Sequence, residues 1–308
     1  MSWIACPDPI VGDAQSVDAI EGVVIPRIRD VEGLAVERVL PVAGRRMVGP
    51  FIFFDQMGPS MLDVGDGLDV KPHPHIGLST VTYLFEGEVR HQDSLGEDRI
   101  IRPGELNLMT AGRGVVHSER TPLDARQQRQ SIYGIQSWLA LPEKFEENPP
   151  SFEHFGLDAL PFVDDNGVKM RVILGEYMSL RASVKTWGEP FYVDVSLAPG
   201  ASLPLPNFAE ERGIYIVSGA LEVDGTSFDD QRLLVLREGL SVTVRNATDR
   251  PVRLMLLGGD MIDGPRHIWW NFVSSSKERI EQAKEEWRTG KFDIVPGDPD
   301  EFVPLPGG

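Results

Sequence analysis

Residues 73–77 of the chain are His-Pro-His-Ile-Gly, and residues 109–119 are Met-Thr-Ala-Gly-Arg-Gly-Val-Val-His-Ser-Glu. In each stretch two polar residues are spaced i, i+2, which sends both side chains to the same face of a β-strand. Two such strands facing each other would bring three imidazoles and one carboxylate together, a set that suits a divalent transition metal. The sequence therefore predicts a metal site, with iron as the leading candidate, at His73, His75, His117 and Glu119.

Short runs rich in Val, Ile, Leu, Thr, Phe and Tyr recur along the rest of the chain, for example at residues 51–54, 80–85 and 191–197. Gly-containing turn signals lie between them. Many short strands separated by frequent turns predict an all-β fold made of sandwiches or barrels. One short C-terminal helix is expected at about residues 276–289, where an apolar stripe favours a packing brace over a binding element.

A stretch rich in Pro and acidic residues at 141–150 is the best candidate for a linker. It predicts an N-terminal metal-binding domain over residues 1–145 and a C-terminal domain over residues 146–308. The spacing from Gly67 to His73 is repeated from Gly200 to Pro206, with Phe208 two residues further on. The spacing is thus repeated in the second half, but Pro206 and Phe208 stand at the positions of the two histidines, and neither residue can bind a metal.

Composition limits the classes of partner. The chain has 308 residues, and Lys+Arg 30 against Asp+Glu 47 gives a net charge of −17, which disfavours direct binding to nucleic acid. No apolar run approaches the roughly 20 residues that span a bilayer, and the N-terminus has no secretory signal pattern. Cys6 is the only cysteine, so no intrachain disulfide can form. These features predict a cytoplasmic protein without a membrane segment.

The motif spacing is similar to that of cupins, which are small β-barrels of the jelly-roll class. A glycine, five residues and His-x-His resemble the first cupin signature, and residues 114–117 resemble the second. The glutamate that usually follows His-x-His is missing, because Ser79 and Thr80 occupy the candidate positions. Glu119 is therefore expected to supply the carboxylate.

With this displaced carboxylate, the chain resembles the pirin family. The similar segments are residues 73–77, 80–84, 91–94, 102–104, 109–119, 287–292 and 302–306. The resemblance implies two cupin barrels packed face to face, metal in the N-terminal barrel only, a degenerate C-terminal barrel, and a monomer. Many pirins have Phe-Glu where this chain has Leu78-Ser79, so the lining near the site, and with it the substrate, is expected to differ.

The resemblance also implies a function. Some pirins cleave quercetin-type flavonols with O₂ and release carbon monoxide, which predicts a quercetin 2,3-dioxygenase that acts on a flavonoid-like small molecule. Fe(II) is the expected metal, although Mn, Ni, Cu or Zn suit the same ligands. Glu119 is also expected to accept the proton of the substrate hydroxyl.

Other pirins look like regulators, and this alternative stays open. In it the protein is a non-enzymatic redox sensor that binds a protein partner, either a transcription factor or a metabolic enzyme, according to the state of the iron. A purely structural metal is disfavoured, because such sites tend to be closed and tetrahedral, with Cys and His ligands.

Three further residues, Asp55, His91 and Arg113, are candidates for supporting the metal ligands. Asp55 follows the apolar run at 51–54, and Arg113 lies in the glycine turn before His117, where it could pair with a nearby carboxylate. His91 and Asp93 share a strand after the turn at 86–87. For that strand a polar surface face is favoured over contact with the metal ligands.

Overall fold

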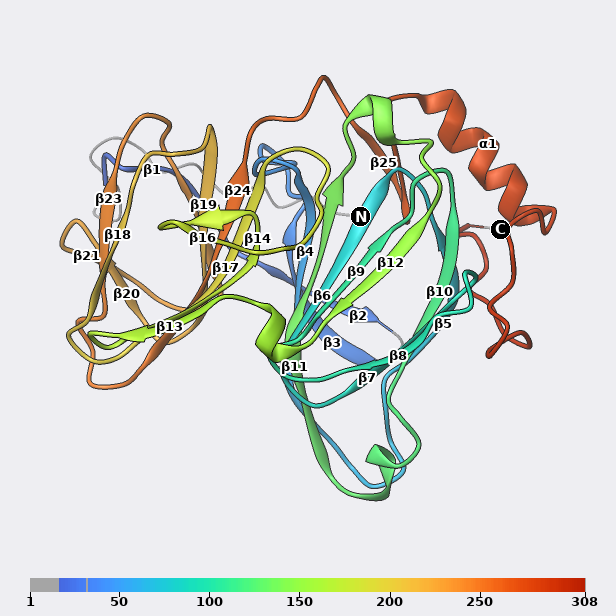
Figure 1. Ribbon diagram of the computed structural model, residues 1–308, viewed down its shortest axis with the longest axis horizontal. Helices are drawn as coiled ribbons and strands as arrows, with labels where there is room; N and C mark the ends of the chain where they lie inside the picture. The colour runs from blue at the N-terminus through green and yellow to red at the C-terminus, as the bar shows by residue number, and fades with distance from the viewer. Residues whose placement is uncertain (1–16, 32, 308) are drawn as a thin grey trace. The chain divides into compact units, whose positions relative to one another are not determined.

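The computed structural model describes residues 17–31 and 33–307, so Cys6 lies outside the described part of the chain. The described residues form β-strands, three short 3₁₀ turns and one α-helix, which confirms the all-β class (Figure 1). None of the helices in this part of the chain is long and apolar enough to cross a membrane. The 3₁₀ turns are η1 (Ala125–Gln127), η2 (Glu143–Phe145) and η3 (Leu157–Ala159).

The chain divides into two compact units, each assembled from separate segments. The unit that contains all six histidines, called the histidine unit below, comprises residues 28–36, 55–157 and 262–308. The second unit comprises the segments up to residue 27, 37–54 and 158–261. The predicted domains, 1–145 and 146–308, stay a prediction, and each unit takes segments from both sides of that boundary.

The histidine unit is built on a small sheet and a large sheet. The small sheet has the order β5 (Asp69–His75), β10 (Val115–Arg120), β7 (Val89–Asp93), β8 (Asp98–Ile101). The large sheet has the order β12 (Ser151–Phe155), β9 (Leu106–Thr110), β6 (Leu78–Glu86), β11 (Gln130–Ala140), β4 (Phe51–Leu62), β3 (Leu34–Leu40), β2 (Arg27–Val31). Residues 37–40 of β3 and 51–54 of β4 are counted with the second unit. Pro72 and Pro74 lie on β5, at the edge of the small sheet, where a missing N–H removes no ladder hydrogen bond.

The two sheets of the histidine unit face each other, as in a jelly-roll barrel. Thr82 on β6 contacts Glu119 on β10, and the ring of Trp138 on β11 meets the ring of His75 on β5 edge-on, with 5.1 Å between centroids. Residues of β6 and β9 are buried almost throughout. The interior of this barrel is therefore where the inward-facing residues of β5, β7 and β10 meet.

The second unit repeats the plan of a large and a small sheet. The large sheet has the order β1 (Ile20–Val24), β22 (Arg232–Leu236), β19 (Glu211–Ser218), β24 (Val252–Gly259), β17 (Pro190–Leu197), β14 (Val168–Leu174), β13 (Phe162–Asp165). The small sheet has the order β18 (Ser202–Leu205), β23 (Val242–Arg245), β20 (Leu221–Val223), β21 (Thr226–Phe228). Strands β15 (Glu176–Tyr177) and β16 (Leu180–Arg181) form a separate hairpin.

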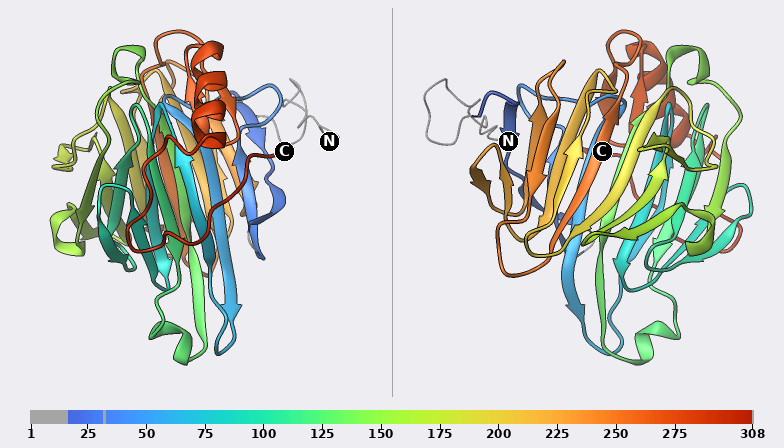
Figure 2. Two further views of the ribbon diagram at one scale, coloured as in Figure 1. Left: turned by 90° about the vertical axis from the view of Figure 1, so that its right-hand side faces the viewer. Right: turned by 60° about the vertical axis from the view of Figure 1, so that its left-hand side comes forward.

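The helix α1 (Lys277–Arg288) confirms the expected C-terminal helix, and Ser276 caps it by accepting a hydrogen bond from the Arg279 N–H. Its buried residues Ile280 and Ala283 pack on Phe272, which lies in a hairpin of β25 (His267–Trp269) and β26 (Phe272–Ser274). The helix is thus a packing brace of the histidine unit. After it, residues 291–307, called the C-terminal segment below, run along the small sheet (Figure 2).

Candidate metal centre

The two motifs form neighbouring antiparallel strands. His117 on β10 lies opposite His73 on β5, and Val115 lies opposite His75. On the other side of β10, His117 lies opposite Asp93 of β7. A β-bulge interrupts the pairing of β10 with β5 between His117 and Glu119. The register therefore gathers the three histidines on one face of the small sheet, as their i, i+2 spacing predicts.

Two glycines connect the motifs by a hydrogen bond next to the paired strands, where Gly77 follows β5 and Gly112 precedes β10. The N–H of Gly77 donates to the carbonyl oxygen of Gly112 at 2.8 Å, and both residues have positive φ, +67° and +52°. A Cβ at Gly77 would lie 2.0 Å from the carbonyl oxygen of Val273, and one at Gly112 would lie 2.0 Å from that of Asn148. Only glycine therefore fits at either position.

The three histidine rings point at one another. One ring nitrogen from each lies within 4.8 Å of the other two, and all three residues are buried. The Nε2 atoms of His75 and His117 are 3.1 Å apart. Nδ1 of His73 donates to the carbonyl oxygen of Lys71 at 2.8 Å, which leaves its Nε2 free for the cluster.

The chemistry of this cluster fits a divalent metal. Burial lowers the pKa of His73 to about 4, and it lowers the pKa of His75 and His117 well below the ordinary value. All three rings are therefore neutral at pH 7, the state in which an imidazole has a lone pair to donate. Bonds of about 2.0–2.1 Å to one ion at right angles separate two nitrogens by roughly 3 Å, which matches the spacing of His75 and His117.

Glu119 lies in the same barrel but is not a member of the three-histidine cluster. Its Oε1 is 3.2 Å from the hydroxyl of Thr82, which is also 2.7 Å from Oε1 of Gln136. Because one hydroxyl proton serves one acceptor at a time, this buried carboxylate is incompletely satisfied by the described residues. Burial raises the pKa of Glu119, while His91 and Thr82 partly oppose the shift. A cation beside it would satisfy the carboxylate.

The predicted surface position of His91 and Asp93 is wrong. Both residues are buried, Asp93 completely, because β7 lies inside the small sheet and the side chains of His91 and Asp93 face the barrel. His91 stacks on Phe152, with 4.4 Å between ring centroids and 18° between ring planes. Its Nδ1 lies 3.3 Å from Nδ1 of His117, so His91 directly contacts one member of the cluster.

The other two supporting candidates are Asp55 and Arg113. Asp55 is buried on β4. Arg113 has an exposed side chain. Its backbone forms two hydrogen bonds with described residues, one from its N–H to Asn148 and one from Arg279 to its carbonyl oxygen. Its guanidinium is therefore not brought to the histidines.

Sequence reasoning missed Thr82 and Trp138, which come from the opposite sheet. A signal for Thr82 was present, because Thr80 and Thr82 alternate with Val81 in a run that is otherwise apolar. Polar residues spaced i, i+2 on a buried strand face the same interior, so they are candidates for contact with a polar site.

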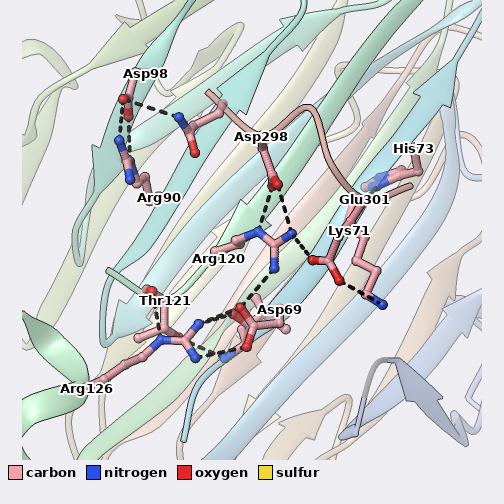
Figure 3. Close-up of polar contacts among 12 residues, drawn as sticks. Asp69, Lys71, His73, Arg90, Asp98, Arg120, Thr121, Arg126, Asp298 and Glu301 are labelled. Atoms are coloured by element: carbon pink, nitrogen blue, oxygen red, sulfur yellow. Dashed lines mark hydrogen bonds and ion pairs between the residues drawn. The ribbon is translucent and has the colours of Figure 1, made fainter. Parts of the chain in front are cut away.

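The strands that carry the histidines are also fastened to the C-terminal segment. Arg120 on β10 donates to both carboxylate oxygens of Asp298, at 2.7 and 3.1 Å, and to Glu301 at 2.8 Å (Figure 3). Lys71 on β5 pairs with Glu301 at 3.3 Å. One ion-pair cluster thus joins the start of β5 and the end of β10 to the C-terminal segment. It restrains the two strands that carry the histidines.

A cavity of about 810 Å³ lies in the histidine unit between α1 and the C-terminal segment. Pro72 and Val116, the residues before His73 and His117, contribute to its lining, but none of the three clustered histidines does. Because alternate residues of a strand face opposite sides, this cavity lies on the outer face of the ligand strands.

Comparison with known proteins identifies two matching family models. The model described as Pirin matches residues 33–139, and the model described as Pirin C-terminal cupin domain matches residues 192–293. A pirin-like protein of Caulobacter vibrioides is 47% identical over 283 residues, which cover 91% of this chain and 97% of the relative.

Two further relatives carry the name of an activity. A protein of Pseudomonas aeruginosa, named a candidate quercetin 2,3-dioxygenase, is 35% identical over 285 residues, covering 89% of this chain and 87% of the relative. A crystal structure of quercetin 2,3-dioxygenase from Acinetobacter baumannii is similar with a TM-score of 0.85 and 32% identity, covering 92% of this chain and 94% of that one.

Proposed function

This chain belongs to the pirin family, and from that we propose that it is a metal-dependent dioxygenase of the quercetin 2,3-dioxygenase type. The convergence of three buried, neutral imidazoles in one barrel is the observation that carries the proposal. The names of the Pseudomonas aeruginosa and Acinetobacter baumannii relatives support the choice of flavonols as substrates.

In this proposal one divalent ion, with Fe(II) as the leading candidate, is held by His73, His75, His117 and Glu119. When bound, the ion supplies Lewis acidity and open coordination positions for an oxygen-rich, chelating substrate. The histidines bind through Nε2, because Nδ1 of His73 is committed to Lys71 and the Nε2 atoms of His75 and His117 face each other.

Glu119 is proposed as the residue that accepts the proton of the flavonol hydroxyl. In the metal-free protein burial raises its pKa, which makes the carboxylate a stronger proton acceptor than an exposed one, and a bound cation would oppose that shift. Thr82 orients the carboxylate from the opposite sheet through its hydroxyl. Trp138 packs edge-on against His75 and helps to hold that ring in place.

The test begins with metal-free protein that is loaded with Fe(II) without oxygen, then mixed with quercetin and O₂. We expect loss of the flavonol absorbance with one carbon monoxide released for each O₂ consumed. His117→Ala should lose both metal and turnover. Glu119→Gln should lower turnover about 10²–10⁴-fold, the usual contribution of a proton-transfer group.

The matched control is His267→Ala, which removes a histidine of the same unit that is outside the cluster. It should retain metal and turnover. Wild-type protein that keeps its metal but turns over no member of a flavonol panel would contradict the enzymatic proposal and favour the non-enzymatic, partner-binding alternative.

A further inference from the structure

A buried carboxylate lies behind the histidine cluster. Asp93 has no exposed surface, and its Oδ1 accepts hydrogen bonds from the N–H groups of Leu95 at 2.9 Å and Glu97 at 3.0 Å. Its Oδ2 lies 3.2 Å from Nε2 of His91. The backbone contacts fix the carboxylate, so its second oxygen is aimed at the His91 ring.

The contacts continue from His91 to the cluster. Nδ1 of His91 lies 3.3 Å from Nδ1 of His117, whose Nε2 faces His75. Phe152 stacks on the His91 ring and sets its plane. Asp93, His91 and His117 thus form one chain of polar atoms that begins at a buried carboxylate and ends at a nitrogen of the proposed metal site.

The direction of the hydrogen bonds in this chain follows from the chemistry of imidazole. If His117 binds a metal through Nε2, a neutral ring carries its proton on Nδ1. That proton is donated to Nδ1 of His91, so His91 carries its own proton on Nε2 and donates it to Asp93. The opposite arrangement would leave a lone pair of His91 facing a buried carboxylate oxygen, and unpaired buried acceptors are costly.

We propose that Asp93 and His91 are positioning residues that hold His117 in the tautomer and ring orientation required for binding a metal through Nε2. The inference rests on the proposed metal site and deepens it. Carboxylates and carbonyls that accept from the free N–H of a metal-binding histidine increase its basicity as a ligand. Here an intervening imidazole transmits that effect from the carboxylate to the ligand.

Two variants of His91 separate positioning from simple packing. His91→Gln keeps a carboxamide that accepts from His117 and donates to Asp93, but it loses the ring that stacks on Phe152. His91→Phe keeps an aromatic ring for Phe152, but it loses both hydrogen bonds. A positioning role therefore predicts tighter metal binding by the Gln variant, and a packing role predicts the reverse.

The assay is titration of the metal-free, full-length protein with Co²⁺ in competition with a chelator. The Phe variant should bind Co²⁺ about 10–100-fold more weakly than the wild type, the usual effect of losing such a partner. The Gln variant should lose less. Equal affinity of the Phe variant and the wild type, or tighter binding by Phe than by Gln, would overturn the inference.

The carboxylate has its own matched pair of variants. Asp93→Asn keeps Oδ1 for the two backbone N–H groups but turns a donor toward Nε2 of His91, so it should weaken Co²⁺ binding about 10–100-fold. Asp98→Asn makes the same change on β8, where the carboxylate is half exposed and pairs with Arg90. It should leave affinity unchanged, and equal losses in both variants would contradict a specific role for Asp93.

The tautomers can be observed without any substitution. Two-bond ¹⁵N–¹H correlation spectra of the Zn²⁺-loaded wild type should show protons on Nδ1 of His117 and on Nε2 of His91. A proton on Nδ1 of His91 would overturn this inference and leave the proposed metal site untouched. If the wild type binds neither Co²⁺ nor Zn²⁺, the proposed metal site itself is overturned, and the inference with it.

Discussion

The metal-free protein should lose stability in acid because of His73. The pKa of this buried imidazole is lowered from 6.5 to about 4, since burial disfavours its charged form. At about 1.4 kcal/mol for each pH unit, that difference corresponds to about 3 kcal/mol. Between pH 6.5 and about 4 the unfolded chain takes up a proton that the folded chain does not, so unfolding becomes more favourable as the pH falls through this range.

The assay is urea denaturation of metal-free protein at a series of pH values, for the wild type and for His73→Gln. The Gln side chain can still donate to the carbonyl oxygen of Lys71, but it does not titrate. The free energy of unfolding of the wild type should therefore fall by up to about 3 kcal/mol more than that of the variant between pH 6.5 and 4. Superimposable pH profiles would show that His73 does not cause the loss of stability in acid. Carboxylates that titrate in the same range affect both proteins equally. His73 also helps to lower the pKa of the buried His75 and His117, so the difference between the two profiles reports His73 together with its effect on those two rings.

Three other substitutions have expected outcomes. Thr82→Val removes a hydrogen bond that lowers the pKa of Glu119, so the pH at which half of the bound metal is lost should rise, and a fall would contradict the role of this contact. Glu146→Ala removes one of the two ion pairs of the buried Arg266 guanidinium, which keeps Asp263, and should lower the free energy of unfolding by about 1–3 kcal/mol in urea denaturation; no measurable loss would count against it. Arg120→Gln should release the C-terminal segment, seen as faster limited proteolysis there, and unchanged cleavage would show that other contacts hold the segment.

The grouping of the three histidines could be predicted from the sequence for a physical reason, while the domain boundary at residue 145 stays a prediction. The i, i+2 spacing within each motif is a local property that places His73 with His75, and His117 with Glu119, on one strand face. The pairing of the two strands is long-range, and the resemblance of both motifs to cupin signatures indicated it. The assembly of each compact unit from segments on both sides of residue 145 depends on long-range strand pairing, such as that of β1 with β22. No local pattern encodes such a pairing.

The supporting residues were harder to predict because they depend on which face of a strand is buried. His91 and Asp93 alternate with Arg90 and Gln92, so both faces of β7 are polar and the pattern does not distinguish them. The strand is buried because β10 and β8 flank it and the large sheet covers its inner face. Arg113 was an equally reasonable candidate, but the tight turn at Gly112 directs its side chain to solvent.

One divalent ion is proposed to bind at the three clustered histidines and Glu119. The most direct test of this site is the metal content of purified protein after removal of all metal and reloading with Fe(II) under anaerobic conditions, measured by elemental analysis with protein concentration. We expect one iron per chain in the wild type and in His267→Ala, and none in His117→Ala. An iron content that is unchanged by His117→Ala, in protein that remains folded, would contradict the proposed site.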